Sequence, residues 1–310
     1  KIKLEEKDIL DDLKDLIEKS KKSKVLIITN TVNKAIDIFL ELQELKVENI
    51  NLLHSRFIYN DRSAKEFKIK KFSENRKENG IWITTQIVEA SLDIDFDYLY
   101  TEMSTLDSLF QRLGRCYRSR EYEGQDANVH IYIENMSGIK YIYDEEINKI
   151  SIDLLKKYDG MMLDENTKVN LVDKLYSEDM LKNSKFLKRF KSGINILDNI
   201  IDYQTGKKEA QKLLRNIENV NIIPKQIYEE NLKLFEYYAK EVNYKERNRI
   251  KREIDKLTIS ISQSQQRKLL DRLTKNPYIK ELLIADLKYD DNIGLLLKKD
   301  EEYEVNEKFL

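Results

Sequence analysis

Short apolar runs alternate with segments of helical period between Lys24 and Ile133, and this alternation limits the possible folds most strongly. Strands that alternate with helices require right-handed crossovers and form a mostly parallel sheet. Polar residues at the carboxyl ends of such strands then share one edge of the sheet. The sequence therefore predicts an α/β domain with flanking helices. Its predicted strands are Lys24–Thr29, Ile50–Leu53, Ile81–Thr84, Tyr98–Tyr100 and Val129–Ile133, and its predicted helices are Asn33–Leu45, Asp61–Phe72 and Leu106–Arg118.

After about Lys140 the pattern changes to long polar segments of helical period. We expect one domain over residues 1–140 and a mainly helical accessory domain over residues 141–310, with a weak strand pair at its end. The predicted helices are Ser151–Lys157, Ile194–Ile201, Lys207–Ile217, Pro224–Ala239, Lys245–Leu257 and Gln263–Leu273, and the strand pair is Asn292–Lys298 with Glu302–Asn306.

Composition limits the number of domains and the kinds of partner that the chain can have. A chain of 310 residues can form two domains with cores of their own, and 8 Gly and 2 Pro favour helix. The net charge of −1 means that a polyanion must be bound by local patches. The single Cys116 fits a reducing cytoplasm. We expect no membrane partner, because the sequence has neither an apolar run of membrane-spanning length nor a signal-peptide core. The start at Lys1 rather than Met suggests a fragment or a processed product.

Leu106–Arg118 is the most informative segment for function. A helix turns about 100° per residue, which places Gln111, Arg115 and Arg118 at about 0°, 40° and 340°, opposite an apolar stripe. Arg112 falls between the two faces. A charged outer face is the ordinary reading of this pattern. Gly114 suggests that the backbone must come close to another group at this position, since glycine lowers helix stability by roughly 1 kcal/mol.

Small polar residues follow the first two predicted strands. Asn30 and Thr31 stand between a strand and a helix, where backbone N–H groups can hold phosphate, although Asn and Thr are also ordinary helix caps. Ser55 and Arg56 follow the next strand, and Arg56 could meet a backbone phosphate. We therefore expect nucleic-acid contacts from these four residues.

The third strand leads into Thr85, whose hydroxyl suits a nucleic-acid phosphate. Asp93 could accept hydrogen bonds from a ribose. A metal site built from Asp93 and Asp95 is an alternative, but a solvated turn is the favoured interpretation for Asp95. The two isolated histidines, His54 and His130, cannot form a nuclease metal cluster, so no metal site is predicted.

These segments, in the order ITNT, LLHSR, TTQIVEASLDID and LFQRLGRCYR, resemble motifs IV, V and VI of the second RecA-like domain of superfamily 2 helicases. The last two are most similar to the CRISPR-associated helicase–nuclease family Cas3. The resemblance covers roughly residues 24–133, and the motif IV match is loose. It implies an ATP-dependent enzyme that translocates on single-stranded DNA in CRISPR interference.

The resemblance also implies residue roles. Arg115 and Arg118 match the motif VI arginines that reach the γ-phosphate of ATP, where an arginine can contribute 10³-fold or more in rate. Gln111 would place the attacking water or link the two domains. Asp93 would lie near the nucleotide sugar, and Asn30, Thr31 and Thr85 would grip the DNA backbone.

Several parts of a complete motor are missing from the sequence. It contains no G-x-x-x-x-G-K-[ST] loop, no D-E-x-[DH] acid and no histidine–aspartate nuclease domain. We therefore expect ATP and Mg²⁺ to bind only together with a first RecA-like domain, and this chain alone to be inactive. The implied partners are single-stranded DNA, that first domain and the HD nuclease domain on the same or a separate chain, and the CRISPR Cascade surveillance complex.

Two alternatives stay open at this stage: a fragment of another superfamily 2 DNA or RNA helicase, and a non-catalytic RecA-like module that binds nucleic acid. Basic stretches in the second half, such as Lys185–Lys191, could track a DNA strand. Such stretches are more often solvated helix faces.

Overall fold

The computed structural model describes residues 1–90, 92–201 and 219–297. Within them the chain forms two compact units, one from residues 1–54 and 65–206 and the other from residues 55–64 and 207–310. The predicted domain boundary at 140/141 stays a prediction.

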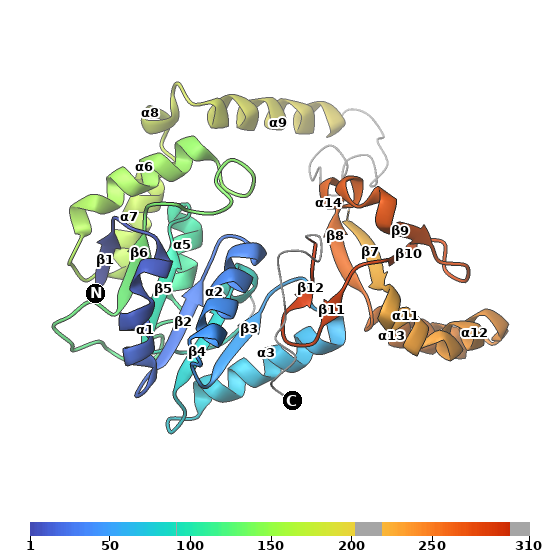
Figure 1. Cartoon of the computed structure of the whole chain (residues 1–310). Coiled ribbons are helices and arrows are strands. Elements are labelled where there is room, and N and C mark those ends of the chain that lie inside the picture. The colour runs from blue at the N-terminus through green and yellow to red at the C-terminus, as the bar shows by residue number, and fades with distance from the viewer. Residues whose placement is uncertain (91, 202–218, 298–310) are drawn as a thin grey trace. The chain divides into compact units, whose positions relative to one another are not determined.

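The first unit is built on a six-stranded, all-parallel sheet in the order β1-β6-β5-β2-β4-β3 (Figure 1). This arrangement confirms the predicted α/β, RecA-like class. The N-terminal strand was not predicted, because its four alternating residues, Ile2–Glu5, are too few to stand out as a strand. It extends the sheet by pairing with β6. The strands are β1 (Ile2–Glu5), β2 (Lys24–Ile28), β3 (Ile50–Leu53), β4 (Gly80–Thr84), β5 (Tyr98–Glu102) and β6 (Val129–Tyr132).

Helices cover both faces of this sheet (Figure 1). The pair α1 and α2 packs on one face, and α3, α5, α6 and α7 pack on the other. In the part of the chain that the structure describes, no helix combines the length and the apolar character that crossing a membrane requires. The helical elements are η1 (Ile9–Asp12), α1 (Leu13–Ser20), α2 (Val32–Glu44), α3 (Tyr59–Glu74), α4 (Ile87–Ala90), α5 (Leu106–Leu113), α6 (Glu145–Leu155), η2 (Lys156–Tyr158), α7 (Glu165–Leu175), α8 (Glu178–Leu181) and α9 (Lys185–Ile201).

The central strand β2 is buried between the two helical layers of the first unit. All five of its residues are buried, and its side chains alternate between the two helical layers. Leu26 and Ile28 belong to the core beneath α3, α5 and α6, where Trp82 of β4 packs against Phe72 at 6.2 Å between ring centroids. Each such side chain contributes about 1.5–3 kcal/mol by burial.

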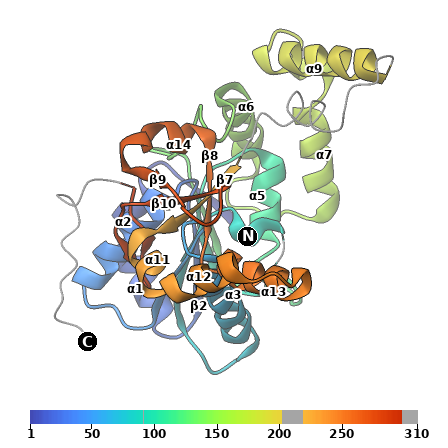
Figure 2. The same ribbon diagram turned by 90° about the vertical axis from the view of Figure 1, so that its right-hand side faces the viewer.

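The second unit combines a mixed sheet in the order β8-β7-β10-β9 with short helices (Figure 2). Strands β7 and β10 are parallel, and β8 and β9 are antiparallel to their neighbours. Ile223, Phe235 and Leu282 belong to its core. The elements are β7 (Asn219–Pro224), α11 (Lys225–Glu230), α12 (Leu232–Lys240), α13 (Tyr244–Asp255), β8 (Ile259–Ser262), α14 (Gln263–Lys268), η3 (Leu270–Arg272), β9 (Leu273–Lys275), β10 (Leu282–Ala285), β11 (Tyr289–Asp290) and β12 (Gly294–Leu295).

This four-stranded sheet corrects the prediction for the second half, in which helices were expected and the sheet was not. Its strands are three to six residues long, too short for a period to stand out. The helix expected over Gln263–Leu273 ends at Lys268. Among the described residues, β11 pairs with β12, and β12 lies within the predicted strand Asn292–Lys298. The predicted segments Lys207–Ile217 and Glu302–Asn306 lie outside the described residues.

Residues 55–64 belong to the second unit through contacts with its later segments. The backbone N–H of Tyr59 donates to the carbonyl of Thr258 at 3.1 Å. The buried Tyr289 hydroxyl accepts from the Ile58 N–H at 3.1 Å and donates to Asp61 at 2.5 Å. Burial raises the pKa of Tyr289 well above its usual value, so this hydroxyl keeps its proton.

Gly80 fixes the entry into β4. Its φ is +134°, and a Cβ at this position would lie 2.5 Å from the carbonyl oxygen of Asn49. We predict that Gly80→Ala lowers the free energy of unfolding by about 1–3 kcal/mol, because it adds a backbone clash to an unfavourable φ. Urea denaturation measures this loss. The control is Gly160→Ala, where φ is +73° but the added Cβ meets no atom within 4 Å. Equal losses in the two variants would contradict the clash.

Candidate nucleotide-facing edge of the sheet

The carboxyl ends of the parallel strands bring three polar loops together. Thr29 and Asn30 follow β2, Thr85 follows β4, and the loop after β5 leads into α5. The N–H of Thr29 donates to the carbonyl of Thr84 at 3.0 Å, which joins the first two loops. This edge of the first unit is the candidate functional site.

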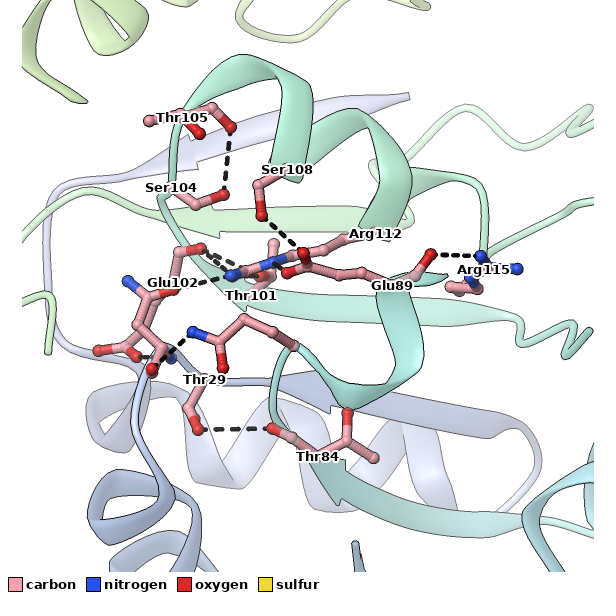
Figure 3. A network of polar contacts seen from close by, with 12 residues as sticks. Thr29, Thr84, Glu89, Thr101, Glu102, Ser104, Thr105, Ser108, Arg112 and Arg115 are labelled. Atoms are coloured by element: carbon pink, nitrogen blue, oxygen red, sulfur yellow. Dashed lines mark hydrogen bonds and ion pairs between the residues drawn. The ribbon is translucent and has the colours of Figure 1, made fainter. Parts of the chain in front are cut away.

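Arg112 of α5 lies at the centre of this edge (Figure 3). Its side chain is 0% exposed, and Nε donates to Glu89 Oε1 at 2.7 Å. Nη1 donates to the Thr101 hydroxyl and to the Glu102 carbonyl, each at 2.9 Å. Nη2 donates to Asn30 Oδ1 at 2.9 Å and to the Tyr143 hydroxyl at 2.7 Å. All five N–H groups of the guanidinium therefore have an acceptor.

Glu89 of α4 supplies the opposite charge and joins α4 to α5. Its second carboxylate oxygen accepts from the Ser108 hydroxyl at 2.8 Å. Its backbone carbonyl accepts from Arg115 Nη2 at 2.6 Å. One residue thus holds both the buried arginine and the arginine that follows the helix (Figure 3).

Glu102, at the end of β5, joins two further loops. Its buried carboxylate accepts from the Asn30 N–H at 2.6 Å. It also accepts from the N–H and the hydroxyl of Ser137, at 2.6 and 2.7 Å. The loops after β2 and β6 are therefore held by one carboxylate.

The predicted helix over Leu106–Arg118 is too long, because α5 ends at Leu113. Gly114 caps it, and Cys116 then forms a parallel bridge with Phe96, for which the chain has to leave the helix. The apolar positions Leu106, Leu109 and Leu113 are buried as predicted. The helical wheel does not describe Arg115 and Arg118, because both lie beyond the helix end.

The two arginines after α5 have different surroundings. Arg115 is buried, and its Nη atoms donate at 2.6 Å to the carbonyls of Leu92 and Glu89. Burial lowers the pKa of its guanidinium from the usual value. Arg118 is 44% exposed and pairs with the 74% exposed Asp93 at 2.8 Å. The structure thus brings Arg118 and Asp93 together.

The neighbouring acids also pair with basic groups. Asp95 accepts from the Arg118 N–H at 3.0 Å and pairs with Arg120 at 3.1 Å. Arg120 also pairs with Asp97 at 2.9 Å. Among the residues that the structure describes, no three His, Cys, Asp or Glu side chains gather so that they could hold a metal ion.

Three of the predicted DNA-contacting residues lie at this edge. Asn30 is buried, and its Nδ2 donates to the Met103 carbonyl at 2.9 Å. The Thr31 hydroxyl caps α2 and bonds Ser137 Oγ at 3.0 Å. Thr85 is buried. By contrast, Ser55 and Arg56 belong to the second unit, so they are not part of the edge described here.

The remaining predicted residue, Gln111, is exposed on α5 and lines a groove with Tyr143. Sequence reasoning missed Tyr143, Glu102, Glu89 and Arg112. The position of Arg112 beside the apolar stripe was a signal for burial, and so was the place of Glu89 within an apolar run.

Known proteins are similar to this chain in sequence and in fold. Residues 21–121 match the family described as "CRISPR-associated nuclease/helicase Cas3, C-terminal". The CRISPR-associated nuclease/helicase Cas3 of Methanothermobacter thermautotrophicus is 33% identical over 217 residues, which make up 69% of this chain and 26% of that protein.

Solved structures agree in fold. The crystal structure of T. fusca Cas3 with AMPPNP has a TM-score of 0.71 at 16% identity, and the match covers 95% of this chain and 42% of that one. A chain of a CRISPR RNA-guided surveillance complex in the pre-nicking state has a TM-score of 0.63 at 17% identity over the same shares. The chain thus spans 26% of the curated relative and 42% of each solved chain.

The Arg112 network predicts that substituting Arg112 destabilises the protein much more than substituting the nearby Arg118. Arg112→Met should lower the free energy of unfolding by about 3–5 kcal/mol, because it leaves the Glu89 carboxylate without its buried partner. Arg118→Met removes an exposed pair and should cost about 1 kcal/mol or less. Urea denaturation monitored by the fluorescence of Trp82 gives both values. Similar losses of unfolding free energy in the two variants would contradict a stabilising role for the buried network.

The thiol of Cys116 can report opening of the segment between Arg115 and Arg118. It is buried and donates to the Asp97 carbonyl at 3.4 Å, and burial raises its pKa well above the usual value. Because the thiolate is the reactive form, we predict that an alkylating reagent labels Cys116 slowly in the native protein and rapidly in denaturant. Mass spectrometry over time measures both rates. Fast native labelling would contradict the burial of this segment.

Proposed function

Since residues 21–121 form a Cas3-like C-terminal domain, we propose that this chain is the arginine-supplying half of an ATP-dependent, single-stranded DNA translocase acting in CRISPR interference. ATP binds between the edge described above and a first RecA-like domain. That domain supplies the phosphate-binding lysine loop and the metal-binding acid, which the present sequence lacks.

The observation that carries this proposal is the exposed position of Arg118. An exposed ion pair is worth about 1 kcal/mol or less, so Arg118 can leave Asp93 at little cost when a phosphate arrives. A guanidinium directed at the γ-phosphate stabilises the charge of the transition state. Asp93, once released, is free to accept from the ribose hydroxyls of the nucleotide.

Arg115 has a different role in this proposal. Its two Nη atoms already donate to backbone carbonyls in the segment between β4 and β5. It can reach a phosphate only after giving up both of these bonds. In the free chain Arg115 therefore holds the loop that carries Asp93. It joins Arg118 at the nucleotide only if domain closure releases both bonds. Gln111 positions the attacking water or contacts the first domain.

We assign no Mg²⁺ ligand to this chain. The described residues provide no cluster of three metal-binding side chains. Asp95 and Asp97 are engaged by Arg120, and Asp93 is engaged by Arg118. We assign the metal ligands to the first RecA-like domain and derive no step through the ion.

Single-stranded DNA is the proposed track. The loop after β2 presents the partly exposed Thr31, whose hydroxyl and N–H groups suit phosphate oxygens. The buried Thr85 would reach the same strand only after the loop after β4 moves. The Asn30 side chain already bonds Arg112 and Met103, so we assign it to positioning these loops. Ser55 and Arg56 are proposed as phosphate contacts within the second unit. The HD nuclease domain and the Cascade surveillance complex are the further proposed partners.

An arginine substitution tests the motor against a non-catalytic module. The chain is combined with a first RecA-like domain of a relative, and ATP turnover is measured with single-stranded DNA. We predict that Arg118→Ala lowers kcat by about 10³-fold or more while DNA binding is retained, because only the transition state loses charge stabilisation. The control is Arg76→Ala, an exposed arginine in the loop before β4, at the opposite edge of the sheet. Equal turnover by Arg118→Ala and Arg76→Ala would rule out the arginine-finger role.

A further inference from the structure

A groove of about 700 Å³ lies beside the Arg112 network within the first unit. Its lining comes from α5, from the loop before α6, from the residue after α7 and from α9. Ser108 and Tyr143 line it, and their hydroxyl groups lie 3.1 Å apart. Tyr143 also accepts from Arg112, so an occupant of the groove would touch the network that holds the edge of the sheet.

Two strongly exposed aromatic rings line this groove. Tyr141 is 94% exposed, and Phe190 of α9 is 56% exposed. Phe190 stacks on Phe186 with 6.4 Å between ring centroids and an interplanar angle of 9°, and Tyr176 contacts Phe186 at 5.9 Å. Large exposed rings are unfavourable in water unless a partner covers them. Flat faces of this kind suit other flat π systems.

The groove is bordered by a strongly basic segment. Residues 182–194 contain five cationic side chains and no acid, and all five cations are exposed: Lys182, Lys185, Lys188, Arg189 and Lys191. Within the described residues, Lys182, Lys185 and Lys188 form no ion pair, whereas Arg189 pairs with Asp144 and Lys191 with Glu178.

The acids of the groove are already engaged. Asp107 accepts from the Tyr176 hydroxyl at 2.8 Å. Asp144 caps α6 as well as pairing with Arg189. Asp107 has no cationic partner in the described ranges, but the three lysines without an ion pair outnumber it. The excess charge beside the rings is therefore positive, which fits an anionic ligand that also carries flat apolar groups.

We propose that this groove binds unstacked bases of single-stranded DNA on Tyr141 and Phe190, while the lysines of α9 contact the adjoining phosphates. The proposal rests on the proposed function, because that function supplies the single strand. Stacking on aromatic side chains together with a basic track binds single strands with little sequence preference. The Tyr143 hydroxyl then connects a bound base to Arg112 and, through it, to Glu89 and Asn30.

The test uses the 310-residue chain and two fluorescein-labelled oligonucleotides of equal length, an oligothymidine and an abasic backbone. Fluorescence anisotropy should show tighter binding of the oligothymidine by the wild type. The double variant Tyr141→Ala/Phe190→Ala should weaken oligothymidine binding by roughly tenfold or more and leave abasic binding unchanged. The variant Lys185→Gln/Lys188→Gln should weaken both ligands and reduce the salt slope by about 0.7 for each phosphate that is no longer neutralised.

The matched control is Phe67→Ala/Tyr244→Ala, which removes two exposed rings elsewhere in the chain. Slow alkylation of Cys116 checks that each variant is folded. The proposal is overturned by equal losses in the groove and control variants, by equal binding of both oligonucleotides to the wild type, or by no binding at low salt. That last result would point to a partner of another class. If turnover depends on Arg118 but DNA affinity is unchanged by removal of the groove rings, the proposed function is retained and this binding site is rejected.

Discussion

The edge of the first sheet depends on one buried cation, the guanidinium of Arg112. Removing such a group from water is costly unless every N–H group finds an acceptor and the charge finds a partner. Its acceptors come from the loop after β2, from α4, from the end of β5 and from the loop before α6. These four segments are therefore fixed together, because displacing any one of them would leave part of the guanidinium unsatisfied.

This constraint also determines the positions of the two arginines that follow α5. Glu89 faces Arg112 with its carboxylate and Arg115 with its backbone carbonyl. The segment that carries Asp93 is thereby held in place, while the exposed Arg118 can exchange its partner. The buried Arg112 is fixed by five acceptors, whereas the exposed Arg118, only six positions later, has, among the residues described, a single ion pair through its side chain. An ATP-dependent motor needs both properties in one segment, because the γ-phosphate is present for only part of each cycle.

Much of the first unit could be predicted from the sequence. Strands such as Lys24–Ile28, whose five residues are all buried, stand out because strands buried on both faces form nearly continuous apolar runs, and the loops after them locate the edge. The end of α5 could not be predicted, because Cys116 leaves the helix to pair with the distant Phe96. The burial of Arg112 was equally hidden, since its five acceptors come from segments far apart in the sequence. The second sheet was missed because its strands are short and their pairing is set by tertiary contacts.

The central claim is that this arginine edge faces ATP bound with a first RecA-like domain. Hydrogen–deuterium exchange tests it most directly, on the wild-type chain mixed with such a domain, with and without a non-hydrolysable ATP analogue. We predict that the backbone amides of residues 92–97 and 115–120 become protected only when both the domain and the analogue are present, while those of β2 do not change. Unchanged exchange in both segments would contradict the claim and would leave the edge a purely structural feature of the fold.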